Sequence, residues 1–339
     1  KNTTEFMAHV NNRFLYKSLS RFEPNEIFRY FEELCVELKE EEDNKVFPVS
    51  GKARDILDAM VSDLKSSGVD IHHEEVINVT KEKYDFIVNT NVQKYTCKHL
   101  VIATGGLTYP KLGSTGVGYD VGKTFNHIII DAFPTNTPLV SNDKFIQDKA
   151  LQGISMKNVD LKYNKTKYSG AFIFTHFGIS GPIVLNISKH VHYGLKKGPV
   201  ELRIDLLPEI KRDYLTERIK EEESVAAVLR GLLPKRFVDF IIKETNTSQN
   251  LSEISKDRMN KMIEMVKNFK IIINSTKGYD HAIVTGGGVS IEDIDTKTME
   301  SKCVYNLYFV GEVLDLDGKT GGYNLTIALS TGHAAGLSI

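Results

Sequence analysis

The residues best suited to chemistry in this sequence gather near its C-terminal end, between Tyr305 and Leu325. An apolar stretch ends there at Gly311, and glycine lets a ligand approach the backbone closely because it has no side chain. Glu312 comes next and supplies a carboxylate that can accept hydrogen bonds from ribose or ribityl hydroxyls. Gly321-Gly322 then opens a predicted helix, whose first N–H groups can hold a phosphate or stabilise negative charge on a flavin ring. The segment therefore predicts a ligand site, the alternative being a plain strand–turn–helix.

Known phosphate-binding motifs are absent from the sequence. Two Gly-Lys-Thr triplets, at 122–124 and 318–320, are preceded by Val117 and Val313 where a Walker A motif needs its first glycine. The dinucleotide fingerprint GxGxxG does not occur either. Any phosphate must therefore be held by other glycine turns.

Histidine and tyrosine side chains supply the candidates for proton transfer. His176 lies in the segment FTHFGISGP, and histidine changes its charge near neutral pH, which suits acid–base catalysis. The alternative is a histidine held by hydrogen bonds in a tight Gly-Pro loop. Tyr109 and Tyr323 could stack on a ligand or donate a hydrogen bond to it, although tyrosine often simply sits half-buried. We take His176 and Tyr323 as candidate catalytic residues.

No metal site and no redox pair are predicted. The cysteines are odd in number and far apart, so they fit neither a disulfide framework, a CxxC pair nor a four-ligand zinc site. Reduced, mostly buried thiols in a cytoplasmic protein are the simplest interpretation of Cys35, Cys97 and Cys303.

The glycine turns follow short apolar stretches that predict buried strands of an α/β fold. Leu100–Ala103 is a continuous apolar run, typical of a parallel strand covered on both faces, and it leads into Thr104-Gly105-Gly106. Similar stretches occupy 281–289 and 307–312. The first 70 residues read as helical, with helices over 14–22, from an N-cap at Asn25 onward, and over 52–66. Short strands are predicted at 69–71, 76–79, 85–89 and 93–97.

Residues 132–275 differ in character from the segments on either side. Pro134 and Pro138 mark a boundary, and short strands are predicted at 159–163, 171–175, 183–187 and 200–205. Helical periodicity follows from Pro208 onward. We therefore expect one domain formed by 1–131 and 276–339, interrupted by an inserted domain with a β-barrel-like part at 132–207 and a helical part at 208–275.

Composition limits the partners of the protein. The 339 residues include 43 Lys and Arg and 44 Asp and Glu, a formal net charge of −1, which gives no sign of bulk attraction to nucleic acid or anionic lipid. No apolar run is long enough to cross a bilayer, and the sequence does not open on a secretory signal. The basic stretch 256–270 could face nucleic acid or a membrane, but interleaved acidic residues favour a solvated helix face. We expect a cytoplasmic protein with no nucleic-acid or membrane partner and leave its oligomeric state open.

The strand followed by Gly311-Glu312 resembles the C-terminal flavin motif of FAD enzymes with two dinucleotide-binding folds, of the glutathione-reductase type. The sequence is most similar to the bacterial FAD flavoproteins called the BaiN/RdsA or aminoacetone-oxidase-like family. That family carries a GxGxxG segment before the region corresponding to this chain. The resemblance covers nearly all 339 residues and rests on the segments FLYKSLSRF (14–22), VFPVSGKA (46–53), ATGGLTYPKLGSTG (103–116), FTHFGISGP (174–182), LLPKRF (232–237), VTGGGVS (284–290) and GEVLDLDGKTGGYNL (311–325).

The resemblance implies FAD as cofactor and assigns roles by position. Glu312, next to Gly311, would meet the ribityl chain, and Val76 would hold the adenine through its backbone. Two groups of residues complete the implied FAD site. The nucleotide would lie near Ala103, Thr104, Gly105 and Gly106, and the isoalloxazine ring along Gly321, Gly322, Tyr323, Asn324 and Leu325.

We expect a FAD-dependent oxidoreductase that transfers a hydride between a small substrate and flavin N5. Amine oxidation of an aminoacetone-like substrate and NAD(P)H-dependent reduction are both attributed to the resembled family, and the sequence does not choose between them. Oxygen or NAD(P)H would be the second substrate. A flavin-binding regulatory or structural protein without turnover is one alternative, and an RNA-modifying flavoprotein is another.

Overall fold

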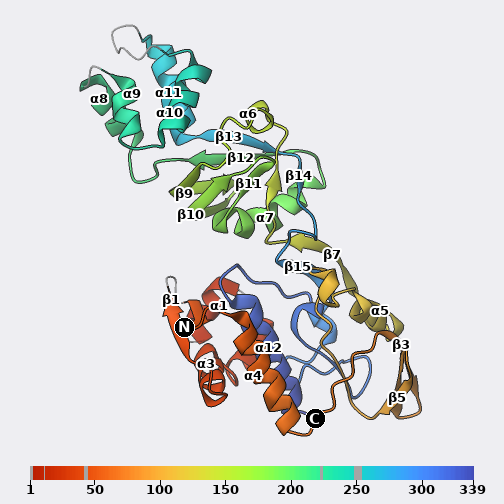
Figure 1. Cartoon of the computed structure of the whole chain (residues 1–339). Coiled ribbons are helices and arrows are strands. Elements are labelled where there is room, and N and C mark those ends of the chain that lie inside the picture. Colours follow the sequence, from red (N-terminus) through yellow and green to blue (C-terminus); the bar gives the residue numbers. More distant parts are fainter. Residues whose placement is uncertain (1–2, 11, 42–44, 222–223, 248–253) are drawn as a thin grey trace. The chain divides into compact units, whose positions relative to one another are not determined.

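The computed structural model describes residues 3–10, 12–41, 45–221, 224–247 and 254–339. The chain forms two compact units (Figure 1). Unit 1 comprises Lys1–Phe133 and Val284–Ile339, and unit 2 comprises Pro134–Ile283. The red to yellow N-terminal part and the dark blue C-terminal part of the chain thus fold together in unit 1, whereas the segments coloured yellow-green through green and cyan to lighter blue form unit 2 (Figure 1).

The N-terminal part of unit 1 is mostly helical. It contains α1 (Thr3–Val10), η1 (Arg13–Leu15), α2 (Tyr16–Leu19), α3 (Pro24–Glu33), a hairpin of β1 (Leu38–Glu41) and β2 (Lys45–Pro48), and α4 (Ala53–Ser66). The predicted helix over 52–66 is confirmed as α4.

Three small sheets build the rest of unit 1. An antiparallel sheet of β3 (Val76–Glu82), β4 (Asp85–Thr90) and β5 (Lys94–Cys97) comes first. The strands β6 (Leu100–Ile102) and β16 (Leu307–Phe309) form a parallel pair, and β7 (Ile129–Thr135) pairs with β15 (Val284–Val289). Between and after them lie η3 (Pro110–Leu112), α5 (Val117–Thr124), η5 (Ile291–Asp293), η6 (Gly311–Val313) and the last helix, α12 (Tyr323–Gly336).

Unit 2 is built on a seven-stranded sheet in the order β13-β12-β9-β10-β11-β8-β14. The strands are β8 (Leu139–Val140), β9 (Ser155–Tyr163), β10 (Thr166–Phe174), β11 (Gly178–Ser180), β12 (Val200–Asp205), β13 (Phe269–Ile273) and β14 (Ser275–Thr276). Its helices are α6 (Lys144–Gln147), α7 (Pro182–Leu195), α8 (Arg212–Glu221), α9 (Val225–Arg230), α10 (Lys235–Thr245) and α11 (Lys256–Lys267).

Each unit has its own core. In unit 1, Phe309, Leu307 and Val313 are buried together with α12 residues such as Ile327. In unit 2, the sheet packs with α7 and with the apolar side of α11. The buried side chains of α11 are Met259, Met262, Ile263 and Val266, so the apolar side of the basic stretch 256–270 is core.

Four predictions from the sequence are wrong. The thiols are not mostly buried, since Cys35 and Cys303 are exposed and Cys97 is half-buried. The run 183–187 lies in α7 rather than in a strand, because Pro182 starts a helix and Ile183, Val184, Ile187 and Val191 are buried at helical spacing. The segment 69–71 forms no strand, since the Val69 N–H donates to Leu64 O at the end of α4. The second helix begins at Pro24, capped by Glu23 and Glu26 rather than by Asn25.

Candidate functional site

Two of the predicted glycine turns are brought together by the parallel pairing of β6 and β16. Leu100 lies opposite Leu307 and Ile102 opposite Phe309. The pairing continues as the Val310 N–H donates to Ile102 O over 3.0 Å. Parallel strands end at the same edge of a sheet, so the 103–106 turn and the Gly311-Glu312 turn leave from one place. The candidate site lies at this edge.

The Glu312 carboxylate is held by hydrogen bonds from the protein. Its Oε1 accepts hydrogen bonds from the Thr285 N–H over 3.0 Å and from the Thr108 hydroxyl over 3.2 Å. The Thr285 hydroxyl is a third hydrogen-bond partner of the carboxylate, which has about four lone-pair sites. Burial raises the pKa of Glu312, and the nearby charge of Asp317 raises it further. The carboxylate is therefore oriented by the protein and keeps an acceptor for a ligand hydroxyl.

Thr285 is the residue that organises this edge, and sequence reasoning did not single it out. Its side chain is fully buried, and its Oγ1 accepts the N–H groups of Leu107 over 2.8 Å and Thr108 over 3.2 Å. Its own N–H holds Glu312. Three segments far apart in the sequence thus meet at one threonine. A signal existed, because Thr285 immediately precedes the Gly286-Gly287-Gly288 run, but its partners depend on the fold.

The glycines of the site serve two different purposes. A Cβ on Gly106 would lie 2.5 Å from Thr285 Cβ and 2.8 Å from Glu312 Oε1, so this glycine permits close packing of the protein against itself. At Gly322, φ is +89° and a Cβ would meet nothing within 4 Å. Gly321 and Gly311 also have positive φ, at +117° and +73°. At Gly322 the turn before α12 therefore presents bare backbone, whereas the Lys45 and Tyr323 side chains lie within 4 Å of the Cβ position of Gly321.

The N-terminus of α12 is held by side chains that were predicted to lie along a flavin ring. The Asn324 side chain accepts from the Gly318 N–H over 2.8 Å and donates to Gly318 O over 3.1 Å, which closes the loop before the helix. The Tyr323 ring is 6% exposed and packs on Phe6 with centroids 5.0 Å apart. This packing favours a structural role for the ring, and the predicted catalytic role of Tyr323 stays a prediction. Leu325 is 72% exposed beside them.

These features fit a flavin dinucleotide. The helix start supplies N–H donors and a partial positive charge, the glycines leave room for a planar ring, and Glu312 Oε2 can accept from a sugar or ribityl hydroxyl. The assignments of Ala103, Thr104 and Gly105 to the nucleotide stay predictions. Ala103 is exposed and Thr104 is half-buried, directly after β6.

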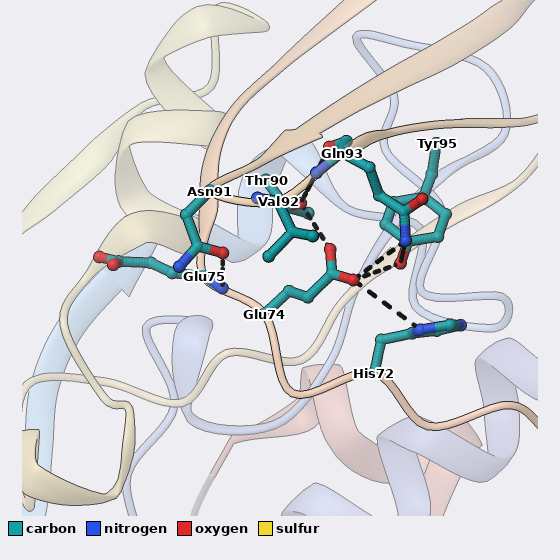
Figure 2. A network of polar contacts seen from close by, with 8 residues as sticks. All are labelled: His72, Glu74, Glu75, Thr90, Asn91, Val92, Gln93 and Tyr95. Atoms are coloured by element: carbon teal, nitrogen blue, oxygen red, sulfur yellow. Dashed lines mark hydrogen bonds and ion pairs between the residues drawn. The ribbon is translucent and has the colours of Figure 1, made fainter.

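Val76, predicted to hold adenine through its backbone, is the first residue of β3 and is half-buried. The segment before it is fixed by a polar network around Glu74 (Figure 2). The Glu74 carboxylate accepts from the hydroxyls of Thr90 over 2.5 Å and Tyr95 over 2.8 Å and from the Gln93 amide over 3.1 Å. The Thr90 hydrogen bond contributes most to a lowered pKa of Glu74. The network ties residues 74–76 to β4 and β5.

The remaining candidates make no hydrogen bond with Glu312 or Thr285 among the described residues. His176 is exposed in unit 2, between β10 and β11, and its ring contacts Phe177. Tyr109 is 54% exposed in a left-handed conformation at the start of η3. His176 as an acid–base residue stays a prediction. Among the described residues, no group of three or more His, Cys, Asp or Glu side chains could hold a metal ion. In the same part of the chain, no helix combines the length and apolar character needed to cross a membrane.

Comparison with known proteins extends over nearly the whole chain. Residues 1–338 match the family described as HI0933-like protein Rossmann domain. The ribosomal RNA dihydrouridine synthase of Haemophilus influenzae is 33% identical over 341 residues, which cover 97% of this chain and 83% of that protein. The protein of the same name from Escherichia coli is 31% identical over 288 residues, covering 83% of this chain and 71% of that protein. The 3-dehydro-bile acid delta(4,6)-reductase of Clostridium scindens is 27% identical over 303 residues, covering 86% of this chain and 74% of that protein.

Proposed function

Because the chain belongs to the HI0933-like Rossmann-domain family of flavoprotein oxidoreductases, we propose that it is an FAD-dependent reductase acting on uridine in ribosomal RNA. The observation that carries the proposal is the edge where β6 and β16 end, with its oriented Glu312 carboxylate and the open backbone at Gly322. Similarity to two ribosomal RNA dihydrouridine synthases supports the substrate. The RNA-modifying alternative raised by the sequence thereby becomes the main candidate.

The names of the relatives share one reaction type. A dihydrouridine is a uridine whose C5–C6 double bond has been reduced, and a bile acid delta(4,6)-reductase also acts on carbon–carbon double bonds. Both names support reduction over amine oxidation as the chemistry of this chain. The relative from Clostridium scindens also supports a second candidate, reduction of a small conjugated ketone. Either substrate is a more specific assignment than membership of the family. NAD(P)H is the proposed source of the electrons.

A bound FAD would supply hydride transfer at its ring nitrogen N5, and the protein would hold and polarise it. In this proposal Glu312 binds a ribityl hydroxyl through Oε2, while Thr285 and Thr108 keep the carboxylate in place. The start of α12 stabilises negative charge on the ring. Unit 2 would be the inserted substrate-side domain, with a barrel-like sheet and a helical part, and His176 its proton donor.

The experiment tests FAD binding first and the substrate second. Purified protein is titrated with FAD, and binding is followed by flavin fluorescence. The holoenzyme is then reduced chemically and incubated with unmodified ribosomal RNA or with a conjugated steroid ketone. Mass spectrometry detects dihydrouridine or the reduced steroid. We expect bound FAD and dihydrouridine. Formation of the reduced steroid alone would move the assignment to the second candidate, and no binding at excess FAD would remove both.

The variant Glu312→Gln tests the site. Glutamine keeps the size of the side chain but replaces one acceptor oxygen by a donor, so a ligand hydroxyl loses its charged acceptor. Hydrogen bonds to charged groups contribute about 1.5–3 kcal/mol, so the Kd for FAD should rise about 10- to 100-fold. The matched control is Glu292→Gln, on the exposed side of η5, which should leave the Kd unchanged. Equal affinities of the two variants would show that Glu312 does not bind the cofactor.

A further inference from the structure

Four neighbouring strands of unit 2 carry a cation at the same position of their register. Lys167 of β10 lies opposite Lys162 of β9, Lys162 opposite Arg203 of β12, and Arg203 opposite Lys270 of β13. All four side chains are exposed. Directly opposite residues of an antiparallel sheet share a face, and like charges in such pairs repel each other. We call these four residues the cation row.

The carboxylates close to the cation row are too few to neutralise it. Asp160 pairs with Lys167 over 2.9 Å. Glu201 is shared by Arg203 over 2.8 Å and Lys270 over 3.5 Å. Within the described residues, no carboxylate lies within ion-pair distance of Lys162. Four cations and two carboxylates leave a local charge of about +2.

A groove of about 650 Å³ opens beside the cation row. Lys162 and Arg203 line it from the sheet, and Lys197 lines it from the turn after α7. Asn164 and Asn268 also line the groove, and so does Glu201, the carboxylate shared by Arg203 and Lys270. A groove lined by cations and other polar residues suits a nucleic-acid strand, whose phosphates and sugar hydroxyls can enter it. A flat lipid surface cannot enter a groove.

We infer that the cation row and its groove bind the phosphodiester backbone of the RNA substrate. The inference rests on the proposed function, since it names where the RNA would be held while a uridine is reduced. Phosphate contacts hold a nucleic acid in register without reading its sequence. Unit 2 would thus supply affinity, and the site of unit 1 would supply the chemistry.

Counterion release gives the size of the expected effect. Each phosphate contact to single-stranded RNA contributes a slope of about −0.7 to log K against log salt concentration. Removing the charges of Lys162 and Arg203 should therefore make the slope of log K against log salt concentration less negative by about 1.4. Binding should weaken roughly 25-fold at 100 mM monovalent salt. Removing Lys197 alone should cost about fivefold. The last change lies outside the sheet, so it tests the groove without touching the strands.

The experiment measures fluorescence anisotropy of a labelled, uridine-rich single-stranded RNA over a range of salt concentrations. The variants are Lys162→Gln/Arg203→Gln and Lys197→Gln. The matched control, Lys235→Gln/Lys243→Gln, removes two exposed charges from α10 of the same unit. Urea midpoints check that all variants fold. The inference requires loss of affinity and a shallower salt slope in the groove variants alone. Equal loss in the control, or no loss in the groove variants, would overturn it.

Two further readouts separate the possible failures. The wild type is also offered vesicles of equal parts phosphatidylglycerol and phosphatidylcholine. The RNA assignment would be overturned if the protein bound these vesicles more tightly than RNA and if this binding depended on Lys162 and Arg203. Dihydrouridine is measured in bound ribosomal RNA with reduced holoenzyme. Groove-dependent RNA binding without dihydrouridine would refute the proposed function and leave the surface intact. Dihydrouridine formed equally by the groove variants at subsaturating RNA would refute the surface and leave the function.

Discussion

The Thr285 hydroxyl offers the sharpest test of how the site is built. Thr285→Val keeps the shape of the side chain but removes the acceptor of two backbone N–H groups, those of Leu107 and Thr108. A buried donor left without a partner costs about 1–3 kcal/mol. Thr108 is buried, whereas Leu107 is half-buried and its N–H can partly use water. We therefore expect unit 1 to lose about 2–4 kcal/mol of stability.

The same substitution should weaken cofactor binding. The 107–108 backbone carries the Thr108 hydroxyl, which donates to Glu312. Valine would also remove the hydrogen bond between the Thr285 hydroxyl and Glu312, so a loosened loop would leave the carboxylate with only one of its three protein partners, the residue 285 N–H. The Kd for FAD should rise about tenfold, equivalent to about 1.4 kcal/mol.

Thr285→Ser is the matched control, because it keeps the hydroxyl and loses only a methyl group. That loss should cost about 1 kcal/mol of stability and leave the FAD affinity nearly unchanged. Urea unfolding followed by circular dichroism measures stability, and the transition of unit 1 is the one that added FAD moves to higher urea. If the valine and serine variants had the same stability and the same Kd, the hydroxyl would not organise the site.

Two other predictions concern packing and pH. Gly106→Ala should destabilise unit 1 by about 1–3 kcal/mol, because its Cβ would collide with Thr285 and Glu312. Gly332→Ala in α12 should be neutral or stabilising, because a Cβ there would meet nothing within 4 Å. Urea midpoints that rank the two variants in the opposite order would contradict this packing. His127 is buried between Gly122 O and the Ser301 hydroxyl, and burial lowers its pKa. Its contribution to stability is therefore present above the unfolded pKa of about 6.5 and is lost as pH falls from there through the lowered folded value. His127→Gln should abolish that part of the pH dependence, and identical urea midpoints against pH for variant and wild type would exclude the histidine as its source.

The overall charge of the chain does not show where charges gather on its surface. The formal net charge of −1 is the basis of the expectation that the chain has no nucleic-acid partner, which stays a prediction. Net charge is an average over all residues, whereas binding depends on charges that lie close together. Lys162, Arg203 and Lys270 are separated by many residues in the sequence and become neighbours through strand register.

Patterns of neighbouring residues are enough to predict the secondary structure around the site. The apolar runs before Gly105 and Gly311 predicted strands β6 and β16, and Gly321-Gly322 predicted the start of α12. These features depend on residue periodicity and on the conformational freedom of glycine, which neighbours in the chain largely settle. Even so, the prediction of a strand at 183–187 is wrong, because Ile and Val occur in strands and on buried helix faces alike.

Which of these elements meet depends on how the whole of each unit folds. The parallel register of β6 and β16 brings Glu312 to the 103–108 turn, and the return of the chain at Val284 brings Thr285 between them. Antiparallel register likewise aligns the cation row across four strands. Such pairings join residues far apart in the chain and are selected by the packing of the whole unit, so no local pattern of residue types encodes them.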